Sequence, residues 1–488
     1  MCGIVGVTGL DGAQHILIEG LKRLEYRGYD SAGIAVHDAS GHTLRARAPG
    51  KVASLEAVMP EGFAGSTGIA HTRWATHGVP NQENAHPHQA GRVSLVHNGI
   101  IENFKTLRDE LIADGRNFSS ETDTEVVAHL LDRELAGGAD PRAALVAVLA
   151  RLEGAFALAA IIEGQPDLVL GARRGAPLIA AVGEGAGFLA SDIMAIAGEA
   201  HSLAYLEEGD AVIVRPSGIE VFDADGADVS RPLVAAPTSI ALAEKGNHRH
   251  FMQKEIYEQP EVVGRTLSAY LDAVSGTVRE RDGIDFSSVS RLIIVGCGTA
   301  SYAGQVAKYW FEAMAGLPVE VDIASEFRYR NPAFMDGDAA LFISQSGETA
   351  DTLEAMRMCK AAGLKTIALI NSPHSSMARE ADIVAPTLAG PEVGVASTKA
   401  FTCQLSALAS LAVLAGAQRG RLDRAGQEAR VASLMSIPGL MNAALSIEQK
   451  IDHLASELAH APIVLYLGRN EFFPLALEGA LKLKEISY

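Results

Sequence analysis

Cysteine, positive charge and long apolar runs are all scarce in this chain of 488 residues, and each shortage excludes a class of protein. The four cysteines are widely separated and form no CxxC pair. This argues against a disulfide framework or a zinc site and favours a reducing compartment, the cytoplasm. Lys and Arg number 41 against 59 Asp and Glu, a formal net charge of −18, so nucleic acid is not expected as a partner. No uninterrupted apolar run approaches the roughly 18 residues that span a membrane, and no signal-peptide pattern opens the chain, so a soluble protein is expected.

The second residue is the most informative position in the sequence. In Met1-Cys2-Gly3, excision of Met1 would leave Cys2 with both a thiol and a free α-amine. The amine, with a pKa of about 7.7–8.0, can act as general base for the thiol. A cysteine at the start of a strand is also often only a small buried apolar residue. The catalytic interpretation therefore depends on a matching substrate pocket.

Residues 1–235 alternate short apolar runs with Gly, Asn and Asp, which is typical of a layered α+β domain. The runs that predict strands are Cys2–Val7, Gly33–His37, Gly68–His71, Ser94–His97, Ala155–Ile162 and Asp210–Val214. Helices are expected over Ala13–Arg23 and Asp123–Arg133, and the residues around Asp123 offer side-chain oxygens for an N-cap.

A mixed polar segment, 236–285, is interpreted as a linker with connecting helices. Within it, Pro260 is expected to interrupt or end a helix. Over 286–425, strand, glycine-bearing turn and helix alternate, which predicts a doubly wound parallel α/β sheet. The expected strands are Arg291–Val295, Val319–Ile323, Ala339–Ile343, Thr366–Ile370 and Ile383–Ala385.

The last part, 455–488, begins the same pattern again, with a strand expected at Ile463–Leu467 and a helix at Leu475–Tyr488. The pattern stops inside an amphipathic helix, without a glycine or proline stop signal. About 25 residues cannot complete an α/β domain. We therefore expect a second, incomplete α/β unit, because the chain is a fragment or because a partner supplies the rest.

Three clusters in the first half supply groups that a nucleophilic cysteine would need. Arg73 can bind a carboxylate through two hydrogen bonds, and Trp74 could close over a small substrate. Asn98 and Gly99 can offer a side-chain amide and a backbone N–H to an oxyanion. Asp123 could hold a substrate ammonium or cap a helix. Taken singly, each cluster also has a structural explanation. The first fits a surface arginine beside a core tryptophan, the second a plain Asn-Gly turn, and the third a helix cap.

Taken in order, Met-Cys-Gly-Ile, Leu-Glu-Tyr-Arg-Gly-Tyr-Asp-Ser-Ala-Gly and these three clusters resemble the class II glutamine amidotransferase domain, an N-terminal-nucleophile hydrolase of αββα architecture. The resemblance covers about the first 235 residues. It implies that Cys2 attacks the side-chain amide of glutamine, giving a glutamyl thioester and ammonia. It also implies that Asn98 and Gly99 bind the oxyanion, Arg73 the α-carboxylate and Asp123 the α-ammonium. The other residues that it assigns to the glutamine site are Trp74, which would gate it, Thr76 and His77.

Three hydroxyl-rich loops in the second half predict phosphate sites, because hydroxyls and backbone N–H groups meet there at helix N-termini. The candidate sugar-phosphate residues are Cys297, Gly298 and Thr299, then Ser344, Gln345, Ser346 and Thr349, and finally Val395 and Ser397. Ordinary helix capping explains any one loop alone. A dinucleotide site with Asp322 on the ribose competes, but Ser301 replaces the third glycine of that fingerprint.

These loops resemble the sugar isomerase (SIS) fold, and the whole chain resembles the glutamine–fructose-6-phosphate aminotransferase (isomerizing) family. The resemblance implies conversion of fructose 6-phosphate and glutamine into glucosamine 6-phosphate and glutamate, with internal ammonia transfer and neither a metal nor an organic cofactor. Glu478, Lys482 and Glu485 fall on one face of the last helix. By the resemblance, Glu485 is the base that moves a proton between C1 and C2, with Lys482 nearby. An exposed, salt-bridged helix face is the alternative.

The family pattern also raises expectations that this sequence does not meet. The family often has Cys-Gly-Thr-Ser where this chain has Ala300 in place of the serine. The family's ring-opening histidine and Schiff-base lysine are missing, so we expect intact glutaminase chemistry but doubtful synthase activity. A homodimer through the SIS half is expected from the family. Two other kinds of protein are alternatives. Another class II amidotransferase would need a pyrophosphate or ATP-binding motif, which this sequence does not show. A phosphosugar-sensing regulator would lack the N-terminal nucleophile, which this sequence has.

Overall fold

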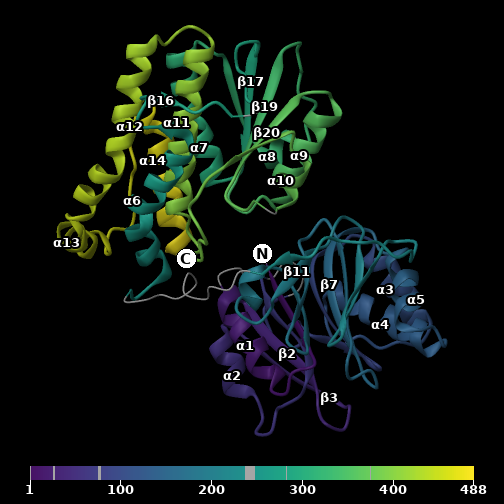
Figure 1. The fold of residues 1–488 in the computed structure, drawn as a ribbon. Helices are drawn as coiled ribbons and strands as arrows, with labels where there is room; N and C mark the ends of the chain where they lie inside the picture. The colour runs from purple at the N-terminus through teal and green to yellow at the C-terminus, as the bar shows by residue number, and fades with distance from the viewer. Residues whose placement is uncertain are drawn as a thin grey trace. The chain divides into compact units, whose positions relative to one another are not determined.

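The computed structural model describes residues 2–25, 28–74, 79–236, 248–281, 283–373 and 375–487 (Figure 1). The chain divides into two compact units, Met1–Ala243 and Glu244–Tyr488. Each unit has its own hydrophobic cores, so each is described by itself.

The first unit is built on two antiparallel sheets. The eight-stranded sheet has the order β14 (Val234–Ala235), β11 (Ser202–Tyr205), β9 (Ile179–Gly183), β10 (Ala186–Ala190), β1 (Gly3–Thr8), β4 (Thr67–Arg73), β2 (Ser31–His37), β3 (Thr43–Pro49). The six-stranded sheet has the order β13 (Gly218–Phe222), β12 (Ala211–Arg215), β8 (Val169–Arg174), β7 (Gly154–Ile162), β6 (Val93–Ile101), β5 (His88–Ala90). The strands predicted within residues 1–235 are all confirmed, and the additional ones are mostly short strands near the sheet edges.

Helices cover the outer face of each sheet, so the unit has four layers. The helices are α1 (Ala13–Leu24), α2 (Val52–Val58), α3 (Phe104–Ala113), α4 (Thr124–Ala136) and α5 (Pro141–Leu149), with a 3-10 turn, η2, at Ile193–Ile196. Side chains from both sheets, among them Ile4, Ile69, Val96 and Val212, form one buried core between them. A second core lies under α1 and α2, and a third under α3, α4 and α5 (Figure 1). This is the predicted αββα architecture.

The second unit is a parallel sheet with helices on both faces, as the alternating pattern predicts. The strand order is β18 (Val319–Ile323), β17 (Arg291–Gly296), β19 (Asp338–Ser344), β20 (Lys365–Ile370), β21 (Ile383–Pro386), and a separate hairpin pairs β15 (Leu271–Asp272) with β16 (Thr277–Val278). One face packs on α6 (Phe251–Tyr270), α7 (Thr299–Ala315), α11 (Lys399–Gln418) and α12 (Arg424–Leu445), and the other on α8 (Ala324–Phe327), α9 (Ala350–Ala361) and α10 (Ser376–Glu380) (Figure 1). Two further helices, α13 (Glu448–Leu458) and α14 (Phe472–Ile486), follow α12. Chain order reverses around β17, so ligands are expected at the carboxyl ends of β17 and β19.

The expectation that Pro260 interrupts a helix is wrong. Helix α6 runs from Phe251 to Tyr270 with Pro260 inside it. Proline removes the N–H that would reach the carbonyl of Ile256, and the side-chain amide of Gln259 donates to that carbonyl at 3.0 Å instead. Pro260 is also buried in the helical face of the domain. Packing and the replaced hydrogen bond together let the helix continue.

The predicted strand at Ile463–Leu467 is also wrong, since these residues form no regular structure. Ile463, Leu465 and Leu467 are 76%, 79% and 91% exposed. A strand is stabilised by pairing with a neighbour and by burial of one face, and the described residues supply neither here. The helix that follows is confirmed as α14, although it starts earlier than expected, at Phe472.

Helix α11 is long and apolar enough to cross a membrane, with a mean hydropathy of 1.6, and 83% of its apolar window is buried within the protein. By the same measure of length and hydropathy, α12 and α13 taken together could also form one span, with a bend of 57° between them. The α11 helix packs against α6 and α7 in the core of the second unit. Burial in a domain core accounts for its composition without a membrane.

Candidate active site

The pairing of β1 with β4 places Cys2 beside Arg73 and Trp74. Gly3 lies opposite Thr72 in the antiparallel register, so the preceding cysteine meets the end of β4. The backbone N–H of Trp74 lies 3.2 Å from the Cys2 Sγ. Gly28 packs on this corner, where a Cβ would come within 2.7 Å of the Arg73 carbonyl carbon. The cysteine is partly buried rather than a core residue.

Asn98 and Gly99 lie inside β6, not in a turn, so the Asn-Gly turn interpretation is wrong. Both residues pair with β7 across the six-stranded sheet. The Asn98 side-chain amide donates to the Cys2 carbonyl at 3.1 Å. Gly99 has φ of +118°, and a Cβ there would lie 2.1 Å from the carbonyl oxygen of Ala155. Asn98, one of the two predicted oxyanion donors, therefore lies next to Cys2.

Arg73 and Asp123 are both buried, 4% exposed each, and Trp74 is 43% exposed. Asp123 precedes α4 without making the predicted side-chain cap. It accepts instead from the Ile101 N–H at 2.8 Å, which ties it to the end of β6. The Trp74 ring stacks edge-on against Tyr29, with centroids 5.5 Å apart. Two predicted site residues, Thr76 and His77, lie outside the described residues.

Burial raises the pKa of the Cys2 thiol above its usual value, although the Trp74 N–H and the charge of Arg73 oppose this. A thiol in this environment is not a thiolate at rest near neutral pH, so it needs a base at the moment of attack. A terminal α-amine on the same residue would be such a base.

The buried histidines behind this site were not predicted from the sequence. His71, His86, His88 and His97 are each at most 5% exposed. Burial lowers the pKa of His71 to about 3 and that of His88 to about 3, so both are neutral. The histidines of β4 and β6 are visible in the sequence, but nothing in it shows that the two strands face one another.

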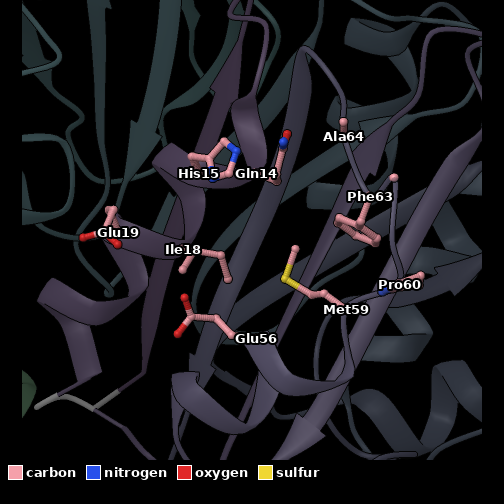
Figure 2. A pocket seen from close by; sticks show the side chains of 10 residues that line it. Gln14, His15, Ile18, Glu19, Glu56, Met59, Pro60, Phe63 and Ala64 are labelled. Atoms are coloured by element: carbon pink, nitrogen blue, oxygen red, sulfur yellow. The ribbon is translucent and has the colours of Figure 1, made fainter.

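A surface pocket of about 480 Å³ opens elsewhere in the first unit, between α1 and α2 (Figure 2). Ile18, Met59 and Phe63 line its apolar part, and Glu19 and Glu56 also line it. None of the predicted glutamine-site residues that the structure describes lines it. Both carboxylates already pair with Lys22, so we assign the pocket no role in the chemistry.

In the second unit, the loop after β17 meets the face of α14. The Thr299 hydroxyl lies 3.0 Å from Glu478 Oε1 and 3.0 Å from Lys482 Nζ. Lys482 also pairs with Glu485 at 2.5 Å. Glu478 is buried, and burial raises the pKa of its carboxyl, although Lys482 and Thr299 oppose this. The interpretation of these residues as an exposed salt-bridged face is wrong for Glu478 and Lys482, whose side chains are 7% and 18% exposed.

The loop after β19 is a compact hydroxyl-rich turn. The Ser344 hydroxyl accepts from the Gly347 N–H at 3.0 Å and lies 3.4 Å from the Thr349 hydroxyl. The Ser346 hydroxyl accepts from the Glu348 N–H at 3.2 Å. Thr349 precedes α9 but makes no side-chain cap, so helix capping does not explain its hydroxyl. Gln345 shares this turn, and its carbonyl accepts from the Asn371 N–H.

The two loops come together because β17 and β19 are neighbours in the sheet. The Thr352 hydroxyl, one turn into α9, lies 4.0 Å from the Cys297 Sγ. Gly298 has φ of +53° and packs near Leu481 of α14. Seven of the predicted sugar-phosphate residues therefore gather at one sheet edge, and they are Cys297, Gly298, Thr299, Ser344, Gln345, Ser346 and Thr349.

The third loop is held by two carboxylates. The Ser397 hydroxyl donates to Glu392 at 2.9 Å, and Val395 is 51% exposed. Glu255 of α6 accepts from the N–H groups of Val393 and Gly394 at 2.5 and 2.9 Å. Burial raises the pKa of Glu255 to about 7, although these two N–H groups oppose the shift.

Glu255→Gln is expected to flatten the pH dependence of stability between about pH 4.5 and 7. The native state holds a proton that the unfolded chain releases in this window, so stability falls as the pH rises, by on the order of 3 kcal/mol. Glutamine keeps an acceptor for the loop but does not titrate. The measurement is the urea midpoint at pH 5 and pH 8, with the exposed Glu261→Gln as control. Equal decreases of the urea midpoint from pH 5 to pH 8 in the wild type and in Glu255→Gln would contradict this account.

No group of three His, Cys, Asp or Glu side chains within the described ranges could hold a metal ion. Asp322, which the dinucleotide interpretation places on a ribose, is ion-paired with Arg330 at 2.6 Å. The folds of the two units agree with the family models, in which a glutamine amidotransferase domain matches residues 71–198 and a SIS domain matches residues 285–414. The chain thus joins a glutamine amidotransferase domain to a SIS domain.

Comparison with known proteins specifies the family. The chain is 54% identical over 490 residues to the glutamine–fructose-6-phosphate aminotransferase (isomerizing) of Mesorhizobium japonicum. It is also 54% identical over 491 residues to the protein of the same name from Zymomonas mobilis. Each match covers 100% of this chain and 81% of the relative. Among solved structures, the C-terminal domain of glucosamine-fructose-6-phosphate aminotransferase from Francisella tularensis is 42% identical, with a TM-score of 0.49 over 50% of this chain and 69% of that one. The chain belongs to the glutamine–fructose-6-phosphate aminotransferase (isomerizing) family.

Proposed function

We propose that this chain converts D-fructose 6-phosphate and L-glutamine into D-glucosamine 6-phosphate and L-glutamate. One observation carries the proposal. A single chain combines a cysteine beside an amide donor, with Asn98 Nδ2 3.1 Å from the Cys2 carbonyl, and a second unit in which Thr299 lies 3.0 Å from both Glu478 and Lys482. Sequence identity of 54% to named members of the family supports the same reaction.

In the first unit, the α-amine freed by removal of Met1 takes the Cys2 proton as the sulfur attacks the glutamine amide carbon. Asn98 Nδ2 and the Gly99 N–H stabilise the oxyanion. The amine then returns the proton to the leaving nitrogen, which departs as ammonia, and water hydrolyses the thioester to glutamate. Arg73 and Asp123 bind the α-carboxylate and α-ammonium of glutamine, and Trp74, with Thr76 and His77, completes the site.

In the second unit, the hydroxyls and N–H groups of the loops after β17 and β19 bind the sugar phosphate. Val395 and Ser397 contribute from the third loop. Glu485 moves the proton between C1 and C2, and Lys482, at 2.5 Å from it, holds its charge in place. We assign residues 1–235 to the amidotransferase part, 236–285 to the connection, 286–425 to the first SIS domain and 455–488 to the start of a second.

The direct test is to incubate the purified chain with glutamine, with and without fructose 6-phosphate, and to quantify glutamate and glucosamine 6-phosphate separately. Both products in equal amounts would support the full reaction. Glutamate without amino sugar would restrict this chain to the glutaminase step. Failure to release glutamate at all would overturn the proposal for the first unit.

Glu485→Gln is expected to reduce amino-sugar formation by about 10²–10⁴-fold, the contribution of a general base, while glutamate release persists. The amide cannot accept the C1 proton but preserves the side chain's shape. Product assays with both substrates measure the two rates in one sample. The exposed Glu457→Gln serves as control, and equal loss in both variants would argue against a specific role for Glu485.

The same proposal includes a homodimer formed through the SIS half and a cytoplasmic location, with neither nucleic acid nor a membrane as partner. Light scattering during size-exclusion chromatography would measure the oligomeric state. A monomer at all concentrations would exclude the dimer.

A further inference from the structure

A buried histidine contacts the predicted oxyanion donor from the side opposite the nucleophile. His71 Nε2 lies 3.0 Å from the Asn98 Oδ1 and 3.0 Å from the backbone carbonyl of His97. A carbonyl oxygen can only accept, so the proton of the neutral ring is on Nε2. The same N–H therefore faces the oxygen of the Asn98 amide.

This contact determines which way the Asn98 amide points. An amide has an acceptor at one end and a donor at the other, and rotation by about 180° exchanges them. With the oxygen facing His71, the NH₂ group faces Cys2, whose carbonyl it reaches at 3.1 Å. In the rotated amide, an oxygen would face the developing oxyanion and repel it.

The ring of His71 is itself held in place. It lies at 1% exposure, edge-on to the His86 ring, with centroids 4.2 Å apart. His86 Nε2 contacts the Thr124 hydroxyl at 2.7 Å, and His97 Nδ1 contacts the same hydroxyl at 3.0 Å. Burial lowers the pKa of His71 to about 3, although its bond to Asn98 opposes the shift. The ring is therefore a fixed, neutral donor across the physiological pH range.

We propose that His71 is a positioning residue, whose Nε2–H orients Asn98 so that the amide NH₂ stabilises the oxyanion of the glutaminase reaction. This inference rests on the proposed glutaminase function. The hydrogen bonds of His71 go to Asn98 and to the His97 carbonyl, so it acts on the reaction only through Asn98.

The experiment compares His71→Leu, His71→Asn and His71→Gln in the full chain by glutamate release. His71→Leu is expected to lower kcat by about 10²-fold, in the range for a lost oxyanion donor, with KM for glutamine changed less than about threefold. Glutamine can place an N–H near the Nε2 position, so His71→Gln should recover to within about tenfold of wild type. Asparagine is too short to do so, and His71→Asn should behave like His71→Leu even if the leucine variant fails to fold.

The decisive measurement adds His71→Leu, or His71→Asn, to Asn98→Ala. A residue that acts only through Asn98 adds no further loss when that side chain is absent. Alkylation of Cys2 by iodoacetamide needs no oxyanion donor, so its rate should stay at the wild-type value in each His71 variant that folds. His88→Leu, another buried neutral histidine, whose Nε2 contacts Thr122, is the matched control and should keep kcat within about threefold.

Several results would overturn the inference. These are an unchanged kcat in His71→Asn, a full additional loss in the double variant, a loss that appears in KM alone, or an equal loss in His88→Leu. If Cys2→Ala still releases glutamate, the proposed glutaminase function fails instead. The two failures are therefore distinguishable.

Discussion

Cys2→Ala should lower glutamate release from glutamine by at least about 10³-fold, because it removes the only atom that forms the thioester. The neighbouring donors remain, since Asn98 binds the Cys2 carbonyl rather than its side chain. Thermal stability should change little, because Cys2 is only partly buried and its sulfur makes weak contacts with Trp74. Coupled assay of glutamate and a thermal melt of the same preparation measure both quantities.

Cys359→Ala is the matched control for this substitution. That thiol is fully buried against the SIS sheet, and burial raises its pKa to about 12, so it is chemically inert. The control should lose stability through a small cavity but keep glutamate release. Residual glutaminase activity in Cys2→Ala above that of buffer would assign the chemistry to another group.

Gly99→Ala should lower glutamate release by about 10²-fold or more and destabilise the first unit by roughly 2–4 kcal/mol. Its φ of +118° is a conformation that side chains rarely adopt, and the new Cβ would lie 2.1 Å from the Ala155 carbonyl oxygen. Strands β6 and β7 would have to separate at this point. That movement displaces the Asn98 amide and the Gly99 N–H together. Glutamate release and urea unfolding measure the two effects.

Gly115→Ala separates backbone strain from the steric clash. Gly115 also has a positive φ, +82°, but no atom lies within 4 Å of the position that a Cβ would take there. The substitution should cost only about 1 kcal/mol and leave the glutaminase rate unchanged. Equal effects of the two alanines on rate and stability would mean that the β6–β7 contact is unimportant.

Much of the site could be predicted because its parts are local in the sequence. Asn98 and Gly99 are adjacent, and the loops after β17 and β19 each present their hydroxyls within a few residues. Parallel strands that are neighbours in a sheet end at the same edge, so a correct strand pattern is enough to expect the loops after β17 and β19 at one edge. Strands that are buried on both faces, such as β17 and β19, show as continuous apolar runs in the sequence.

Most of the incorrect predictions concern properties that depend on distant contacts. Pro260 stays within α6 because Gln259 satisfies the freed carbonyl and the helix packs on the domain core. The apolar run Ile463–Leu467 predicts a strand, but without a partner strand it forms none. The Asn-Gly pair has the composition of a turn, yet pairing with β7 keeps it extended.

The sequence by itself determined the two-part organisation, the αββα and parallel α/β layers, and the residue types at each site, because these depend on periodicity and on short motifs. Only the tertiary structure decided that His71 contacts Asn98, that Glu255 binds the loop at Val393, and that Thr299 joins Glu478 to Lys482. Each of these contacts links residues between 27 and 183 positions apart. Which side chains meet over such separations is decided by strand register and helix packing, which no local pattern encodes.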